Sequence, residues 1–501
     1  MLPLTRRAFL GGVGAVAAAA AGRRSTMART TERLALNQAR TRAALDALGR
    51  GELRLPDTVP DPSRPPGTDT LPAVEHIVVL MMENHSYDNL FGVLPAERSN
   101  GVLDGLPLGA PPTSWNPAGV SATNPDAAGR LQHAFVMPST CQLAHRPGQE
   151  WTASHNAFDG GRNDGFVRTP IAFGSSELVG AVAMGYWDGR ALPFTASLAQ
   201  TFPVADRWFC SLLGQTDPNR RYLIAATSCG MVDDLALSAT SLTVGGAEQD
   251  ALLALPANGT IFDRLSCYGI DWADYNANFP TGATAELYPV DDSGPALSRQ
   301  KPLTQFFADC RAGSLPGFAL VDPDFSRASQ ENPQDMTVGE RFMASVVQAI
   351  GDSPVWRKTL LVITYDEHGG YYDHVPPPPA LAPDPVPPVV APGQSAYDGF
   401  HRYGFRVPAV VVSPYAVPNG VTHALYDHTS ILALVERKWN LPAMTFRDAN
   451  ANDLSGFLDG QALARRRPTF PALPPLAAPG LSDCPVDLAE RIPPAGSVTA
   501  A

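Results

Sequence analysis

Oxygen-bearing side chains directly follow two apolar segments of strand length in this sequence. The first segment ends in Glu83-Asn84 and the second in Asp366-Glu367. Ligands of an open parallel sheet collect beyond the carboxyl ends of its strands, so these side chains are expected to meet there. Glu83-Asn84 alone could equally cap a helix. The adjacent acids of the second pair need a cation or an arginine to neutralise them, and the four residues together form an oxygen-rich set suited to a hard divalent metal ion.

A threonine, Thr216, follows a turn that leads into a helix. Gly214 forms the turn, and Pro218 lies in the first helical turn. Thr216 is therefore expected at or just before the helix N-terminus, where free N–H groups stabilise an anion such as a transferring phosphoryl group. Capping the helix is the commonest role of threonine there, and this segment alone leaves both roles open. A metal held nearby would deprotonate the hydroxyl for attack on phosphorus, and Arg220 could hold phosphate oxygens in bidentate fashion.

The composition is that of a globular protein and argues against some classes of partner. The chain has 501 residues, of which 44% are hydrophobic, and its 37 lysines and arginines against 49 aspartates and glutamates give a net charge of −12. This balance disfavours nucleic acid or an anionic membrane as the main partner. An anionic substrate would need a local source of positive charge, such as a metal ion or a helix N-terminus.

Apolar runs of strand length alternate with segments of helical periodicity along the chain. The runs are nearly continuous, as expected for strands that are covered on both faces. This alternation predicts an α/β sandwich around a parallel sheet. The expected strands are 76–82, 318–321, 359–365 and 407–412, and the expected helices are 193–201, 218–227, 340–350 and 428–439.

Changes of composition predict how the chain is organised. Residues 230–314 are polar and rich in glycine and alanine, with weak periodicity, which predicts an insertion or cap. Residues 376–392 are dominated by proline, which predicts a polyproline-like surface excursion. We predict a signal peptide at 1–22, an N-terminal arm and linker at 23–70, the main domain at 71–445 and a proline-rich tail at 446–501.

The first residues have the features of an export signal. Arg6 and Arg7 precede Phe9-Leu10 and a weakly apolar stretch of glycine and alanine that ends near Ala21. Paired arginines in this setting are the address of the twin-arginine route, which predicts a periplasmic, cell-wall associated or secreted protein. The apolar run is too short to span a bilayer, and we expect no integral membrane segment after removal of the signal.

The six cysteines lack the CxxC or CxxH spacing of zinc and redox sites. Export makes some disulfides plausible, while a buried free thiol is an equally good role for Cys210. The sequence does not give the pairing.

Residues 83–92, ENHSYDNLFG, resemble the ENxSxDxxFG opening of the bacterial phosphoesterase family that holds non-specific phospholipases C and a respiratory-burst-inhibiting acid phosphatase. Further segments that look like blocks of this family follow in order. They are 158–166, 184–186, 216–220, 260–265, 365–370, 373–375 and 426–430. The resemblance extends over about residues 74–440, and several long blocks in the right order are a highly specific signal.

This resemblance implies an alkaline-phosphatase-like three-layer sandwich, with a mostly parallel central sheet and an inserted cap, and a phosphoenzyme mechanism. It makes Glu83, Asn84, Asp366 and Glu367 the ligands of one divalent metal ion, which could be Ca, Mg, Mn, Zn or Fe. Thr216 becomes both a metal ligand and the nucleophile that forms a phosphothreonine.

Histidines are candidates for contact with the substrate. The resemblance implies that His145 contacts the phosphate or the leaving group, and protonating a leaving group calls for such a residue with a pKa near the working pH. His155 is as well explained by a structural hydrogen bond, His374 by the fold of its loop, and His428 by support of the site or a place beside a helix cap. The residues expected to bind substrate are Asn219, His155, His374 and His428.

Two details bear on the activity. The threonine of the 216–220 block resembles the phospholipase branch, whereas the acid phosphatase branch tends to serine, so the leading prediction is a phosphodiesterase of phospholipase C type that acts on a phosphate-ester or phospholipid substrate. Many family members have a histidine before a proline where this chain has Asn332, which could supply a weaker, neutral contact to phosphate. The alternatives are a broad-specificity acid phosphatase acting on monoesters and a non-catalytic surface binding protein. A binding protein would have lost the nucleophile or ligands, and none is lost here.

Overall fold

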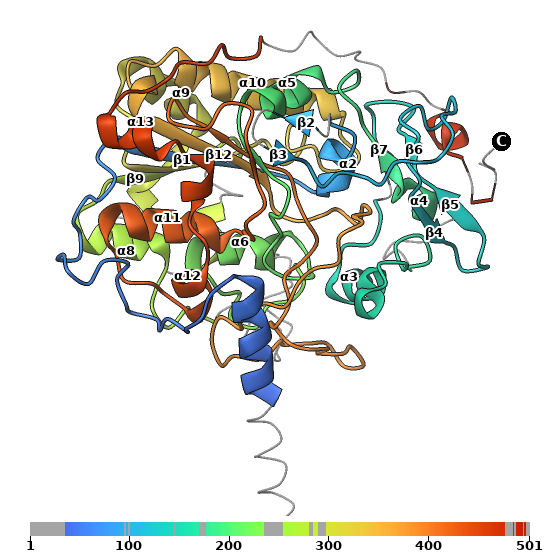
Figure 1. The fold of residues 1–501 in the computed structure, drawn as a ribbon, viewed down its shortest axis with the longest axis horizontal. Coiled ribbons are helices and arrows are strands. Elements are labelled where there is room, and N and C mark those ends of the chain that lie inside the picture. Colours follow the sequence, from blue (N-terminus) through green and yellow to red (C-terminus); the bar gives the residue numbers. More distant parts are fainter. Residues whose placement is uncertain are drawn as a thin grey trace, which may run out of the picture.

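The computed structural model describes most of the chain, and its arrangement can be followed in Figure 1. The described residues are 36–94, 97–98, 101–144, 146–169, 177–234, 254–279, 284–288, 297–475, 484, 487–493 and 495–496. The predicted signal peptide at 1–22 and the candidate residue His145 lie outside them.

An eight-stranded sheet forms the centre of the molecule, with the strand order β10-β9-β11-β1-β12-β13-β8-β14. Neighbouring strands are parallel except where β13 pairs with β12 and with β8. The strands are β1 (His76–Met82), β8 (Val204–Ala205), β9 (Trp272–Asn276), β10 (Gln300–Pro302), β11 (Phe318–Asp322), β12 (Thr359–Tyr365), β13 (Ala409–Val412) and β14 (Val421–Thr422). The predicted α/β fold with a mostly parallel central sheet is confirmed.

Helices cover both faces of this sheet and make a three-layer sandwich (Figure 1). The two central strands, β1 and β12, are apolar and buried almost throughout, so neither face of the sheet can be left to water. One face carries α5 (Pro193–Thr201), α9 (Leu303–Ala312) and α10 (Met336–Gly351). The other face carries α6 (Thr216–Ala225), α8 (Ile261–Cys267), α11 (Thr429–Trp439) and α12 (Phe446–Asn450).

Several predicted elements coincide with the observed ones. The strands predicted at 76–82 and 359–365 are β1 and β12, and the helix predicted at 193–201 is α5. The helix predicted from residue 340 begins at Met336, because the Asp335 side chain accepts the Thr337 N–H and caps it.

The insertion predicted at 230–314 is wrong for the part of it that the structure describes. Strands β9 and β10 belong to the central sheet, and α8 and α9 pack beside them. The polar sequence WADYN conceals β9 as a strand, since Asp274 and Asn276 are buried there. The segment that does lie beside the sheet is the described part of 97–186 (Figure 1). It carries β2 (Glu97–Arg98), β3 (Gly101–Val102), β4 (Thr123–Pro125), β5 (Leu131–His133), β6 (Phe135–Val136), β7 (Gly185–Tyr186), α3 (Trp151–Phe158) and α4 (Glu177–Val182).

Segments at both ends of the described chain pack on the main domain. Residues 36–47 are helical, and Ala44 and Leu45 pack in one cluster with Phe209 and Leu381. The region predicted as a tail begins with α12, which contacts α11 and is therefore part of the sandwich. Within the described residues no helix has the length and apolar character needed to cross a membrane.

One disulfide joins Cys141 of the 97–186 segment to Cys484 near the C-terminus. The other four cysteines have free thiols, and Cys210 is buried. The pairing is set by tertiary proximity, because 343 residues separate the two bonded cysteines.

Candidate active site

The two predicted pairs of polar residues meet at the carboxyl end of the sheet. β1 and β12 are parallel neighbours paired over their whole length, so Glu83-Asn84 and Asp366-Glu367 leave the sheet side by side. The Asp366 amide donates to the Met82 carbonyl at 3.1 Å, which holds the two strand ends together. All four side chains are buried.

The side-chain amide of Asn84 lies among the carboxylates. One end of it is 2.9 Å from Glu367 Oε1, and 2.9 and 3.3 Å from the two carboxylate oxygens of Asp366. The same end is 3.3 Å from the hydroxyl of Thr216. A nitrogen in this position would donate to the carboxylates, whereas an oxygen would complete a set of oxygen ligands for a cation.

Thr216 is the first residue of α6, and its geometry separates the two roles that the sequence leaves open. Gln215 is the N-cap residue, and no side chain caps this helix. The Thr216 hydroxyl instead faces Asn84 at 3.3 Å and hydrogen-bonds to the Asp366 carboxylate. Thr216 is half-buried, so its hydroxyl is directed at the oxygen cluster from a position that water can reach.

Asn219 shapes the turn that carries Thr216. Its Oδ1 accepts two backbone N–H groups at 2.8 and 3.1 Å, and its Nδ2 donates to the carbonyls of Gly214 and Gln215 at 3.1 and 2.9 Å. The side chain is fully buried. Both ends of the amide are used within the turn, so Asn219 has a positioning role. The contact with substrate that the sequence predicted for Asn219 is not supported.

Arg220 is a buried counter-ion at the ends of the central strands. Its three guanidinium nitrogens each face one carboxylate, at 3.2 Å from Glu83, 3.1 Å from Asp322 and 3.4 Å from Asp366. Burial opposes the charge, but these carboxylates outweigh it and raise the pKa of Arg220. The Arg220 side chain is only 3% exposed, and its guanidinium nitrogens are already taken by carboxylates of the protein. The predicted bidentate contact of Arg220 with phosphate is therefore not supported.

The cluster is strongly acidic even with Arg220 in place. Burial, together with Asp366, raises the pKa of Glu83 and of Glu367 well above the ordinary value. Cation–oxygen bonds of about 2.1 to 2.5 Å put neighbouring ligand oxygens about 3 to 3.5 Å apart, and the separations around Asn84 are of that size. The oxygen-rich donor set and the uncompensated charge therefore both fit a hard divalent cation.

Sequence reasoning missed two residues beside the cluster, Glu331 and Arg146. The Glu331 side chain hydrogen-bonds to Glu83, and Arg146 lies 3.9 Å from Glu331 and 3.4 Å from Glu150. The Arg146 side chain is 20% exposed, so it is a partly open cation, unlike Arg220. Its place next to His145 was the one available sequence signal.

Two buried histidines stand behind the carboxylates. His428 Nε2 lies 2.7 Å from the Asp366 carbonyl oxygen, and His368 Nδ1 lies 3.0 Å from Glu367 Oε2. Burial lowers the pKa of His428 to about 4 and that of His368 to about 3, so both rings are neutral near pH 7. His428 therefore has a supporting position beside Asp366, and its predicted contact with substrate is not supported.

His155 and His374 do not join the cluster. The His155 ring stacks on Tyr397 in a separate pocket. His374 lies 2.7 Å from Asp88 and 3.2 Å from Asp104. Although burial opposes it, these hydrogen bonds raise the pKa of His374 to about 10. Both expectations of substrate contact are thus corrected by partners that hold the rings elsewhere.

Asp88, Asp373 and His374 form a second group that could hold a metal ion by distance alone, since their ligand atoms lie within 4.8 Å of one another. Arg406 already supplies a counter-charge there, with contacts of 3.0 Å to Asp88 and 2.9 Å to Asp373. The arginine and both aspartates are buried. We therefore assign this group to a structural ion-pair network that ties α2 (Tyr87–Phe91) to the loop after β12.

Asn332 is engaged within the protein. Its Nδ2 donates to the Leu143 carbonyl at 3.1 Å, and its Oδ1 accepts the Tyr371 hydroxyl at 3.2 Å. Both ends of the amide are occupied, so the neutral contact to phosphate considered for Asn332 is not supported.

Comparisons with known proteins identify the family of the chain. The Phosphoesterase family matches residues 74–442, and the chain belongs to that family. It is 31% identical over 444 residues to "Phospholipase C B" of Mycobacterium tuberculosis (strain ATCC 25618 / H37Rv), covering 82% of each chain. It is 31% identical over 409 residues to "Non-specific phospholipase C1" of Arabidopsis thaliana, covering 75% of this chain and 69% of that one. The protein is therefore a phosphoric ester hydrolase.

Among solved structures, a protein of the alkaline phosphatase superfamily from Vibrio parahaemolyticus aligns over 64% of this chain and 72% of that one. The sequence identity is 12% and the TM-score is 0.31.

Gly369 permits the close packing of the cluster. It has φ of +64°, and a Cβ there would lie 2.0 Å from the Asn84 carbonyl oxygen. We expect Gly369→Ala to displace Asn84 and to lower kcat/KM at least about tenfold, about 1.4 kcal/mol of transition-state stabilisation. Gly393→Ala is the matched control, because Gly393 has φ of +89° with nothing within 4 Å of its Cβ. Equal effects of the two substitutions on activity would contradict the steric role of Gly369.

Proposed function

We propose that this protein is a phosphodiesterase of phospholipase C type that transfers the phosphoryl group of its substrate to Thr216. The observation that carries the proposal is the half-buried Thr216 hydroxyl, directed at the oxygen cluster from the N-terminus of α6. The phospholipase C names of relatives at 31% identity support a diester substrate with a lipid group.

In this mechanism the Thr216 oxygen attacks phosphorus, the bond from phosphorus to the diacylglycerol oxygen breaks, and diacylglycerol leaves. The phosphothreonine that forms still carries the headgroup as its second ester. Water then cleaves the phosphothreonine, which releases the phosphorylated headgroup and restores the hydroxyl. A divalent cation held by Glu83, Asn84, Asp366 and Glu367 would lower the pKa of the Thr216 hydroxyl and offset the charge of the carboxylates. His145 is our candidate for protonating the leaving group, with Arg146 facing the phosphoryl oxygens in the role first given to Arg220.

The substrate class is tested with the purified full chain on phosphatidylcholine and on matched chromogenic mono- and diesters. We expect a higher kcat/KM for the diesters, because relatives named phospholipase C cleave at a diester. A monoester kcat/KM above that of every diester would replace this proposal with the broad-specificity phosphatase.

Metal dependence is tested by a readout that does not need turnover. A cation that binds only the folded state at 100 times its dissociation constant stabilises it by about 2.7 kcal/mol, so chelation should lower the melting temperature and readdition restore it. The Asp366→Asn, Glu367→Gln double variant should lose this metal-dependent shift together with activity. Asp271→Asn, at a carboxylate whose side chain is 72% exposed, is the control and should keep both. A metal-dependent shift that survives in the double variant would refute the site.

Thr216→Ala should lose nearly all turnover and still fold, with only a small fall in melting temperature, because the side chain makes no capping hydrogen bond and loses only its contacts with Asn84 and Asp366. Thr216→Ser keeps a hydroxyl and should retain part of the activity. With phosphatidylcholine as substrate, mass spectrometry of an acid-quenched reaction should find phosphocholine on the peptide that contains Thr216 in the wild type and not in Thr216→Ala. Normal turnover by Thr216→Ala would overturn the mechanism.

Arg146→Ala should raise both KM and the inhibition constant of inorganic phosphate by about tenfold or more, as expected for loss of one charge-assisted contact. Arg146→Lys should restore part of the loss, since it keeps the charge and not the fork. Arg162→Ala, at a side chain 67% exposed, is the control and should change neither constant. Unchanged phosphate inhibition in Arg146→Ala would remove this residue from the site.

We also propose export by the twin-arginine route to the periplasm, the cell wall or the medium. The Cys141–Cys484 disulfide supports it, because disulfides persist in oxidising compartments. Replacing Arg6 and Arg7 by lysine keeps the charge and should leave the precursor in the cytoplasm. Normal export of that variant would sink the proposal.

A further inference from the structure

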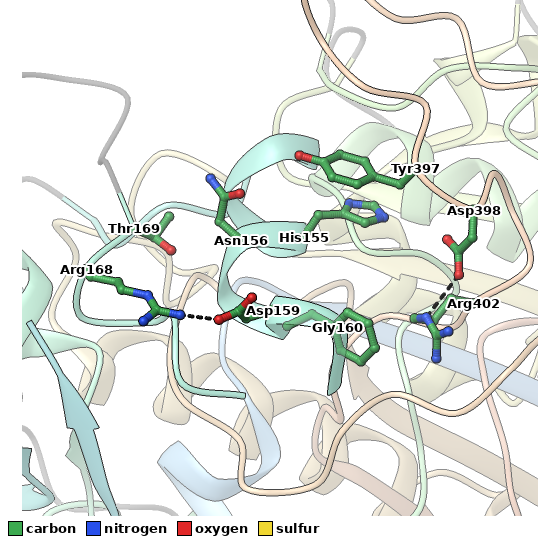
Figure 2. A pocket seen from close by; sticks show the side chains of 10 residues that line it. His155, Asn156, Asp159, Gly160, Arg168, Thr169, Tyr397, Asp398 and Arg402 are labelled. Atoms are coloured by element: carbon green, nitrogen blue, oxygen red, sulfur yellow. Dashed lines mark hydrogen bonds and ion pairs between the residues drawn. The ribbon is translucent and has the colours of Figure 1, made fainter. Parts of the chain in front are cut away.

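A pocket of about 700 Å³ lies between α3 and the chain near Tyr397, apart from the carboxylate cluster. Figure 2 shows it bounded by a pair of aromatic rings and by two arginine–aspartate pairs. A volume of this size suits a small organic ligand. None of the residues placed in the mechanism above lines the pocket.

One wall of the pocket is a rigid aromatic surface. The rings of His155 and Tyr397 are stacked with centroids 3.9 Å apart and 7° between their planes. His155 Nδ1 lies 2.7 Å from the Trp151 carbonyl oxygen, and burial lowers the pKa of His155 to about 4, so the ring is neutral and fixed. Tyr397 is 42% exposed, so part of its ring and its hydroxyl stay available to a ligand.

The charged side chains on the other walls neutralise one another. Arg402 pairs with Asp398 at 3.1 Å, and its guanidinium stacks over the Phe158 ring at 4.5 Å. Arg168 pairs with Asp159 on the pocket wall (Figure 2), and it also pairs with Asp164 at 2.8 Å. Both arginines that line the pocket are paired with a carboxylate, so neither has an unbalanced charge that would attract phosphate. Each aspartate lining the pocket faces a guanidinium that would repel an ammonium group.

Hydrogen-bonding capacity nevertheless remains on these walls. The Asp398 side chain lines the pocket and is 26% exposed, so its carboxylate can accept a ligand hydroxyl although Oδ1 itself is buried. Exposed Asn156 also lines the pocket, on the opposite side of the α3 ribbon from Tyr397 (Figure 2). Paired donors and acceptors next to an aromatic ring, with no net charge, suit a neutral ligand rich in hydroxyl groups.

The pocket is mechanically joined to the active site. Asp233 accepts the Trp151 N–H of α3 at 2.6 Å and the Gln394 amide at 2.9 Å, so it holds both walls. Its neighbour Asp234 accepts the Asp217 N–H at 2.7 Å, next to Thr216. His155 lies five positions after Glu150, the N-cap residue of α3, which is a rise of about 7.5 Å.

We infer that this pocket binds a neutral polyol, a sugar or cyclitol ring with vicinal hydroxyls, whose C–H face lies on Tyr397 and whose hydroxyls bond to the Asp398 and Arg402 side chains. Two sources share this chemistry: the headgroup of a phospholipid such as phosphatidylinositol, and a free carbohydrate. The headgroup source rests on the proposed phospholipase activity, whereas the carbohydrate source does not.

Binding is tested directly by calorimetry with myo-inositol and with a methyl glucoside, using the full chain carrying Thr216→Ala so that no turnover intervenes. We expect saturable binding that Tyr397→Ala weakens at least about tenfold, as for removal of an aromatic contact. Asp398→Asn should weaken it through the hydroxyl acceptor and serves as a second variant if Tyr397→Ala fails to fold. Tyr268→Ala, at another tyrosine 37% exposed, is the control and should leave binding unchanged. Absence of saturable binding, or binding equal in Tyr397→Ala and the parent, would overturn the inference.

The active enzyme distinguishes the two sources. If the pocket takes a headgroup, Tyr397→Ala should raise KM for phosphatidylinositol at least about fivefold and leave KM for phosphatidylcholine unchanged. If it takes a free carbohydrate, polyol binding persists and neither KM changes. An enzyme inactive on every phospholipid that still binds polyols would refute the proposed phospholipase activity and leave the pocket assignment intact.

Discussion

The guanidinium of Arg220 is the interaction on which the catalytic end of the molecule depends. It joins Glu83, Asp322 and Asp366, which follow or end the adjacent strands β1, β11 and β12, to the helix that begins at Thr216. Three buried carboxylates in this position would repel one another without a cation. Removing one partner from such a buried set costs about 3 to 5 kcal/mol, so the same residue holds the sheet ends together and fixes the place of Thr216, the proposed nucleophile.

The negative charge of the two buried acidic groups is balanced to different extents. Around Asp88 and Asp373, Arg406 and a charged His374 supply enough positive charge, and the group serves the fold. Around Asp366 and Glu367, one arginine serves several carboxylates and the nearby histidines are neutral. The second group is therefore left short of positive charge, which is the condition for binding a divalent cation.

The residues around the site also fall into two groups, those that support its structure and those proposed to take part in the chemistry. Asn219, His428 and Gly369 are buried and lie against backbone groups of the site, which gives them a supporting position. Thr216 and Arg146 are partly exposed, and both have a chemical role in the proposed mechanism. The segment 97–186 brings α3 beside them, and with it a pocket whose charges are internally balanced.

The sequence by itself determined the central strands and the four residues that follow β1 and β12, because continuous apolar runs and polar residues at strand ends are local signals. It could not determine the partners of Arg220, Asn219, His155 and His374. The residue type is the same whether the side chain is free to bind phosphate or is already held by a distant carboxylate or carbonyl. It also concealed β9, whose buried aspartate and asparagine read as surface, and the Cys141–Cys484 pair, separated by 343 residues. These features depend on which distant groups come into contact and lose their water, and only the tertiary structure decides that.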